Sequence, residues 1–191
     1  ANTLADPKIE WFAGSTKTGE NDNWGGTATL TGAFGSVGAF GYTGPASLDS
    51  AALVNITVPD NSVLVSGVGN SRGAVIAEIY DATPSSAHVA STPRLLNVSV
   101  LKVIETAASL TTGFVIGGQT SRTVLVRAIG PGLAAAFGVP GVMPDPQLTL
   151  YNGASVKIAE NDNWGGGAEV TGAGTAVGAF AVANAASRDA C

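Results

Sequence analysis

Charged residues, cysteine and histidine are all scarce in this sequence, and each scarcity excludes a class of protein. One Cys and one His among 191 residues rule out a disulfide framework and a Cys/His zinc cluster. Nine Lys and Arg stand against 14 Asp and Glu, which gives a net charge of −5. This acidic balance argues against nucleic-acid binding and against a basic helix lying on a membrane surface.

Long apolar runs are also lacking. Residues 170–187 carry no charge, but they are rich in Gly, Ala and Thr and too weakly apolar to cross a bilayer. The first six residues have neither the basic nor the apolar region of a signal peptide, so we expect any such peptide to have been removed already. The sequence therefore predicts no membrane insertion.

Glycine and apolar residues are abundant instead. The chain has 26 Gly and is 45% hydrophobic, while only 12% of its residues are charged. The charged share is about half of what a globular protein usually has, and the glycine share is about double. A chain with this much Val, Ile, Leu and Phe can bury enough surface to fold, so the composition predicts a folded, glycine-rich and β-rich protein.

The strongest feature of the sequence is an internal repeat. Residues 20–26, Glu-Asn-Asp-Asn-Trp-Gly-Gly, recur as residues 160–166. Residues 20–51 and 160–191 align at a constant offset of 140 without a gap, and 18 of the 32 pairs are identical. The chain therefore derives from a tandem array with a period near 140 residues.

The repeat implies an unusual division of the chain. Residues 82–93 form a small, polar, proline-bracketed run that is typical of a linker. We interpret residues 1–81 as the later part of one repeat unit and residues 94–191 as the earlier part of the next. Residues 1–51 and 141–191 are then homologous copies, and each part lacks segments that the other supplies.

Short runs of alternating apolar and polar residues predict strands. These runs are residues 8–12, 54–58, 63–65, 74–80, 94–104, 113–116, 123–129 and 147–151, with a hairpin turn at 69–73. Helical spacing of apolar residues predicts short helices over 30–40 and 170–180, and one helical turn at 132–137. The sequence therefore predicts a mainly all-β fold, with β-sandwich or jelly-roll-like modules and one or two short helices.

Several of these motifs resemble known modules. Asp-Pro-x-Leu-x-Leu-Tyr-x-Gly at 145–153, Ile-Ala-Glu-Asn-Asp-Asn-Trp at 158–164, and the runs ending at Asp81 and Pro131 resemble the tandem repeats of large secreted bacterial proteins. More distantly, residues 148–164 and 63–80 are similar to bacterial pre-peptidase C-terminal domains, which are jelly-roll-like sandwiches appended to secreted enzymes. The resemblance implies an extracellular accessory or structural repeat without catalytic activity.

The repeated Asn-Asp-Asn block is the one candidate metal site. Carboxylate and amide oxygens are the ligands that Ca²⁺ takes in proteins, so calcium is a candidate cofactor. Because adjacent Asx residues do not match the spacing of an EF-hand loop, an Asx-capped turn beside a core Trp is the favoured alternative. The residues concerned are Asn21, Asp22, Asn23, Asn161, Asp162 and Asn163.

No arrangement in the sequence predicts catalysis. His88 stands alone in the predicted linker, the carboxylates are scattered, and the glycine runs lack the Lys of a phosphate loop. Arg127 either contacts a carboxylate of a neighbouring turn or faces solvent. Cys191 either forms a bridge between chains or has no role, and the second reading is favoured.

We therefore expect an extracellular or cell-surface structural protein that is not an enzyme. In the main hypothesis its partners are copies of itself, joined head to tail into filaments by exchange of strands. One alternative is a piece of a multi-repeat adhesin or stalk that binds carbohydrate or another surface protein. The other is a non-catalytic accessory domain of a secreted hydrolase.

Overall fold

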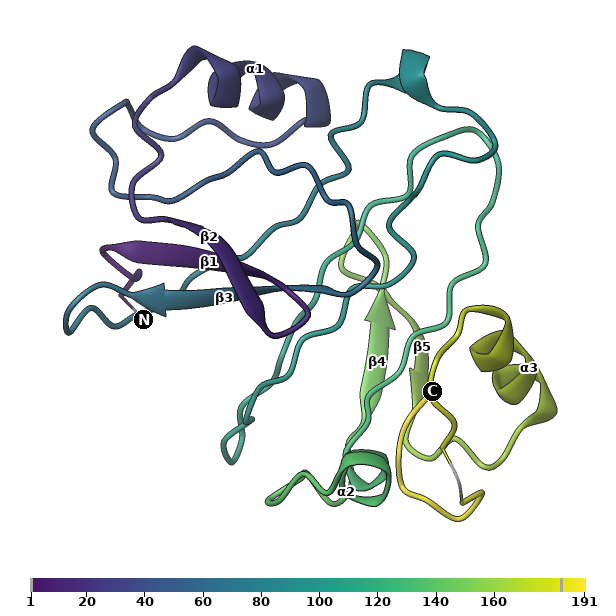
Figure 1. Ribbon diagram of the computed structural model, residues 1–191. Coiled ribbons are helices and arrows are strands. Elements are labelled where there is room, and N and C mark those ends of the chain that lie inside the picture. Colours follow the sequence, from purple (N-terminus) through teal and green to yellow (C-terminus); the bar gives the residue numbers. More distant parts are fainter. Residues whose placement is uncertain (1, 183) are drawn as a thin grey trace. The chain divides into compact units, whose positions relative to one another are not determined.

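The computed structural model describes residues 2–182 and 184–191, and the chain divides into two compact units (Figure 1). The first unit is Ala1–Leu95 and the second is Leu96–Cys191, so each contains one copy of the repeated block. Among the described residues, no helix combines the length and the apolar character needed to span a bilayer.

The first unit is built on a three-stranded antiparallel sheet in the order β2-β1-β3. Strand β1 lies in the middle, where β2 covers one edge and β3 the other. The elements of this unit are β1 (Pro7–Ala13), β2 (Thr16–Asn21), α1 (Ala28–Val37), β3 (Asn61–Gly67) and the 3-10 helix η1 (Ser85–Ala87).

Helix α1 carries the aromatic core of the first unit. The Thr27 hydroxyl caps the helix by accepting the backbone N–H of Leu30, and the helix ends at Gly38, whose φ is 73°. The ring of Phe34 lies 5.7 Å from that of Trp24 and 5.2 Å from that of Tyr42. Trp24 is only 8% exposed, so this cluster is the best-buried apolar part of the unit.

The second unit contains a two-stranded antiparallel sheet and two short helices. Its elements are α2 (Pro131–Phe137), β4 (Leu148–Tyr151), β5 (Lys157–Asn161) and α3 (Ala168–Ala176). Pro131 stands at the first position of α2, where its fixed φ suits a helix start and no N–H is needed.

The two units repeat the same strand pairing. Ile9 pairs with Asn21 where β1 meets β2, and Leu148 pairs with Asn161 where β4 meets β5. Both pairings also have a register shift at the same place, between Trp11 and Phe12 in one and between Leu150 and Tyr151 in the other. The sequence repeat is therefore also a repeat of backbone geometry.

The structure confirms the predicted antiparallel strands and short helices, but it corrects the architecture. The chain has 15% helix and 17% strand in small separate sheets, which is a mixed fold and not a clear all-β sandwich. The strands predicted at 8–12, 63–65 and 147–151 are present in β1, β3 and β4. The predicted helices are present as α1, α2 and α3.

The other predicted strands are wrong as regular elements. Residues 54–58, 74–80, 94–104, 113–116 and 123–129 form no strand, and the expected hairpin is replaced by a single bridge between Thr3 and Ala74. A β-type sequence becomes a strand only when a neighbouring strand pairs with it, and these segments have no ladder among the described residues.

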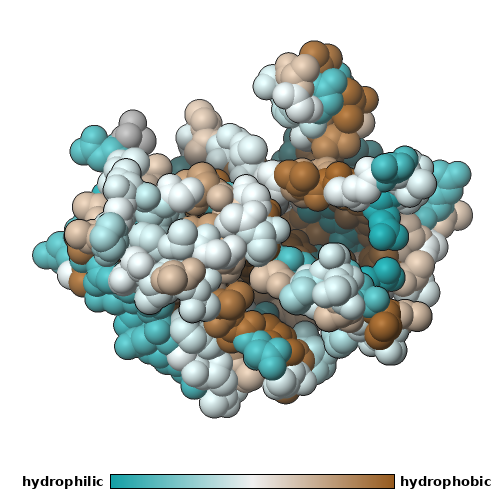
Figure 2. Space-filling view, turned by 90° about the horizontal axis from the view of Figure 1, so that it is seen from above, coloured by the Kyte–Doolittle hydropathy of each residue, from teal (hydrophilic) through white to brown (hydrophobic). Residues whose placement is uncertain are grey.

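Many apolar side chains of these unpaired segments lie open to solvent. Leu101 is 76% exposed and Val115 is 95% exposed. Figure 2 shows hydrophobic residues at the surface of one face of the molecule. Apolar exposure on this scale is typical of a surface that meets another chain.

The close packing of the repeated turn yields a first prediction. Gly165 and Gly166 both have positive φ, 68° and 72°, but a Cβ on Gly166 would lie 2.5 Å from the Cβ of Ala185. A Cβ on Gly165 would find its nearest atom at 4.0 Å. Gly165→Ala should lower the free energy of unfolding by about 1–2 kcal/mol, because alanine is strained in the left-handed conformation. Gly166→Ala should lower it by about 1–3 kcal/mol more, because its methyl group would overlap Ala185.

Urea denaturation of the two variants measures this difference in the free energy of unfolding. The matched pair isolates the contact with Ala185, because both substitutions add the same methyl group at a similar φ. Equal losses of stability would contradict the packing described here.

Candidate functional site

One asparagine side chain closes the repeated turn of the first unit. The carboxamide of Asn21 donates to the backbone carbonyl of Asn23 (3.1 Å) and accepts the backbone N–H of Ala51 (3.0 Å). Asn21 therefore joins the end of β2 to a segment thirty residues further along the chain.

The second unit repeats this hydrogen bonding. Asn161 donates to the carbonyl of Asn163 (3.2 Å) and accepts the N–H of Cys191 (3.0 Å). The indole of Trp164 donates to the carbonyl of Asn184, as the indole of Trp24 donates to that of Gly44.

The predicted calcium ligands therefore lie together within each turn, one set per unit. The carboxamides of Asn21 and Asn161 are used in holding the turns, while Asp22 and Asp162 are exposed. Across the described residues, His, Cys, Asp and Glu nowhere gather in threes that could hold a metal ion. The contacts are those that an Asx-capped turn requires, and calcium binding at these residues stays a prediction.

Asp189 is the most deeply buried polar residue described, with 0% exposure. Its carboxylate accepts the backbone N–H groups of Gly130 (2.7 Å) and Gly132 (3.0 Å) at the start of α2. The hydroxyl of Ser187 donates to the same carboxylate. Hydrogen bonds from N–H groups to a buried carboxylate fix the position of the segment that supplies them.

Glycine at positions 130 and 132 permits this close approach. A Cβ on Gly132 would lie 2.9 Å from Oδ2 of Asp189, and a Cβ on Gly130 would lie 2.0 Å from the carbonyl oxygen of Met143. Just before these glycines, Ala128 exchanges two backbone hydrogen bonds with Ala190 (2.8 and 3.0 Å). Residues 128–132 are therefore attached to the end of the repeated block at Ala128, Gly130 and Gly132.

Arg127 extends the same contact to the loop after α3. Its guanidinium donates to the carbonyl of Phe180 (2.6 Å), and its Cζ lies 4.4 Å from the centre of the Phe180 ring. The ring of Phe137 packs edge-on against Phe180 at 5.0 Å. From the sequence, Arg127 was expected either to contact a carboxylate or to face solvent. The structure instead shows it against a backbone carbonyl and an aromatic ring.

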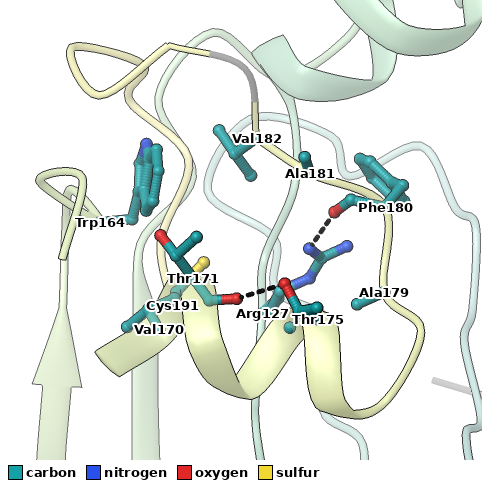
Figure 3. Close-up of a pocket in the computed structure, with 11 residues that line it drawn as sticks. Arg127, Trp164, Val170, Thr171, Thr175, Ala179, Phe180, Ala181, Val182 and Cys191 are labelled. Carbon is teal, nitrogen blue, oxygen red and sulfur yellow. Dashed lines mark hydrogen bonds between the residues drawn. The ribbon is translucent and has the colours of Figure 1, made fainter. Parts of the chain in front are cut away.

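A cavity of ≈ 90 Å³ lies between Arg127 and Trp164, above α3 (Figure 3). Gly174 and Val182 are among the residues that line it. At an offset of 140, these positions hold Phe34 and Tyr42, whose rings pack on Trp24 in the first unit. The smaller residues therefore leave open a space that aromatic rings fill in the first unit.

Sequence reasoning missed both Asp189 and the two glycines that contact it. The one available signal was that Asp49 and Asp189 are identical in the two copies of the repeat. Their separation of 57 and 59 residues from the glycines gave no indication that they meet.

Comparison with known protein families, curated proteins and solved structures found no match to this chain. The resemblance to secreted bacterial repeats therefore stays a prediction.

The Asn161 contacts predict a change in the reactivity of Cys191. Burial raises the pKa of the Cys191 thiol, Arg127 opposes this increase and Asp189 adds slightly to it, so the thiolate needed for alkylation is scarce near neutral pH. Asn161→Ala removes the acceptor of the Cys191 N–H and should release this end of the chain. We expect faster alkylation by iodoacetamide and a loss of about 1–2 kcal/mol in the free energy of unfolding.

Asn21→Ala is the matched control, since it removes the equivalent side chain from the other unit. It should leave the alkylation rate of Cys191 unchanged, and an equal acceleration in both variants would contradict the local anchoring.

The burial of Asp189 predicts that the two equivalent aspartates differ in their effect on stability. Asp189→Ala leaves two backbone N–H groups unpaired, so it should lower the free energy of unfolding by about 3 kcal/mol or more. Asp49→Ala removes a half-buried carboxylate whose described side-chain partner is Ser47, so its cost should be about 1 kcal/mol. Thermal and urea unfolding of both variants measures this, and similar losses would contradict it.

Proposed function

We propose that this chain is an extracellular structural protein whose copies associate head to tail by exchange of strands. The supporting observation is that one repeated block has different neighbours in the two units. Strand β1 is paired with β3 over seven residue pairs, from Pro7 with Gly67 to Ala13 with Asn61. Strand β4 has the same register toward its hairpin partner, but in the described residues it has no strand on the other edge.

An unpaired strand edge accepts a strand from another chain. Its backbone N–H and C=O groups give affinity, and the alternating side chains give specificity. The β3 sequence is the strand type that fits this edge, because it already pairs with the homologous strand β1. In the proposed assembly the edge of β4 therefore receives the β3 segment of the next copy.

The exposed segments of β-type sequence supply further support. Residues 94–104 and 113–116 carry apolar side chains that lie open to solvent. Pairing with a neighbouring copy would bury them and complete the second layer of a sandwich. In this proposal the predicted β-sandwich forms only when two copies assemble.

Head-to-tail contacts of this kind do not close on themselves, so they generate filaments. The extracellular location rests on the resemblance to secreted repeats. The non-catalytic role rests on the same resemblance.

The incomplete repeats also fit a second proposal, in which this chain is one stretch of a longer multi-repeat adhesin or stalk. The segments would then be completed by neighbouring repeats of the same polypeptide, and exposed loops would bind carbohydrate or another surface protein. An accessory domain of a secreted hydrolase is the third alternative. The intact mass of the natural protein separates them: 18.9 kDa favours the self-assembling subunit, and a much larger mass favours the other two.

Negative-stain microscopy and sedimentation of the purified chain test the assembly directly. We expect filaments that grow with protein concentration. A synthetic peptide of residues 59–68, which contains β3, should shorten the filaments by occupying the free edge of β4. A peptide of the same composition in scrambled order is the control.

Discrete monomers at all concentrations would contradict self-assembly. Filaments of unchanged length in the presence of the β3 peptide would contradict the role of the β4 edge. Repeating the experiment with a calcium chelator tests the Asn-Asp-Asn turns, since loss of filaments on chelation would support calcium binding there.

A further inference from the structure

The cavity of the second unit lies where the first unit holds two aromatic rings. Gly174 and Val182, which line the cavity, match Phe34 and Tyr42 at an offset of 140. In the first unit, the ring of Phe34 stacks on that of Trp24 at 5.7 Å, and the ring of Tyr42 meets it edge-on at 5.4 Å. The space beside the second tryptophan is therefore the place of an aromatic ring that positions 174 and 182 do not supply.

The exposure of Trp164 shows the effect of these two replacements. Its counterpart Trp24 is only 8% exposed, whereas Trp164 is half-buried. Both indoles donate to a backbone carbonyl twenty residues later in the chain (3.1 and 3.0 Å), so the two rings are held in the same way. The difference in exposure therefore comes from the residues around the ring, and it leaves part of the Trp164 indole open to a stacking partner.

Helix α3 leaves room for a ring at this position. A Cβ on Gly174 would find its nearest atoms, in Ala179 and Leu125, at 4.0 Å, which is an ordinary van der Waals distance. A Cβ on Gly132, by contrast, would lie 2.9 Å from the carboxylate of Asp189. No close approach of the described atoms therefore demands glycine at position 174, and the cavity of ≈ 90 Å³ occupies the place of the absent side chain.

The lining places a positive charge across the space from the indole. Figure 3 shows Arg127 and Trp164 on opposite sides of this space, with α3 below. The carbonyl of Phe180 takes one of the five N–H groups of the Arg127 guanidinium. Burial raises the pKa of the Cys191 thiol, so this neighbour is uncharged near neutral pH. Among the described lining residues, Arg127 therefore carries the one charge.

An aromatic surface and a guanidinium in one cavity are complementary to an aromatic carboxylate. Guanidinium groups bind carboxylates through paired N–H donors, and indoles stack on other aromatic rings. The carboxylate of Asp189, whose charge would oppose such a ligand, is not among the lining residues and accepts the N–H groups of Gly130 and Gly132. We propose that this cavity binds a small aromatic carboxylate, with its ring beside Trp164 and its carboxylate on the guanidinium of Arg127.

This inference goes beyond the proposed function, because it concerns a ligand of the second unit and needs no association between copies. Benzoate is the simplest probe of the class, and saturation-transfer NMR on the full chain measures its binding. We expect saturable binding with a dissociation constant of about 1 mM, which is usual for a ligand of about nine non-hydrogen atoms.

Two further probes separate the ring from the charge. Cyclohexanecarboxylate keeps the carboxylate without an aromatic face, and benzyl alcohol keeps the aromatic ring without a charge. Each should bind several-fold more weakly than benzoate, because each loses one of the two interactions. Binding of benzyl alcohol or of cyclohexanecarboxylate as strong as that of benzoate would contradict the assigned ligand class.

A variant that restores a ring of the first unit tests the location of the site. Gly174→Phe places a phenyl group in the cavity, so the affinity for benzoate should fall by roughly tenfold or more, since a filled cavity has no room for the ligand. Gly172→Phe is the matched control, because Gly172 lies on the same helix and a Cβ there would have no described atom within 4 Å. This control adds the same ring outside the cavity and should bind benzoate like the unaltered chain.

A second variant keeps the test independent of how well Gly174→Phe folds. Val182→Tyr supplies the other ring of the first unit and should also weaken benzoate binding by roughly tenfold or more. Circular dichroism identifies which variants keep the fold. No saturable binding of benzoate to the unaltered chain, or unchanged binding in a folded Gly174→Phe or Val182→Tyr variant, would each overturn the inference.

Discussion

The hydrogen bonds of one asparagine side chain hold each repeated block together. Asn21 and Asn161 each close a turn and also bind the backbone of a segment thirty residues later. This clamp lies beside the Trp of each block, whose backbone N–H donates to the carbonyl of Asp49 or Asp189 on the return segment. Because the clamp is complete within residues 20–51 or 160–191, the block keeps its geometry in both units although its surroundings differ.

The two units differ in what covers this block. In the second unit residues 127–132 bury Asp189, and in the first unit β3 completes the sheet beside β1. Each block therefore has one neighbour that the other lacks. The exposed apolar segments are the physical basis for proposing association between copies, since open apolar faces gain free energy by being covered.

Local patterns predicted only part of the local structure. The period-two alternation at 8–12 and 147–151 and the helical spacing near 30–40 and 170–180 correspond to observed strands and helices. The same alternation at 54–58 and 94–104 produced no strand, because pairing depends on a partner that the pattern does not specify. The Asn-Asp-Asn block was identified from its repetition, but the roles of Asn21 and Asn161 as clamps required the position of residues 51 and 191.

The sequence by itself determined the repeat and its offset of 140. It also indicated β1, β3, β4 and the short helices, because their patterns depend on residues close together in the chain. Only the tertiary structure decided that Asp189 is buried under Gly130 and Gly132, and that Arg127 lies over Phe180. Such contacts join residues more than fifty positions apart, and their formation depends on which segments the fold brings together. Identical residues in the two copies therefore acquired different surroundings.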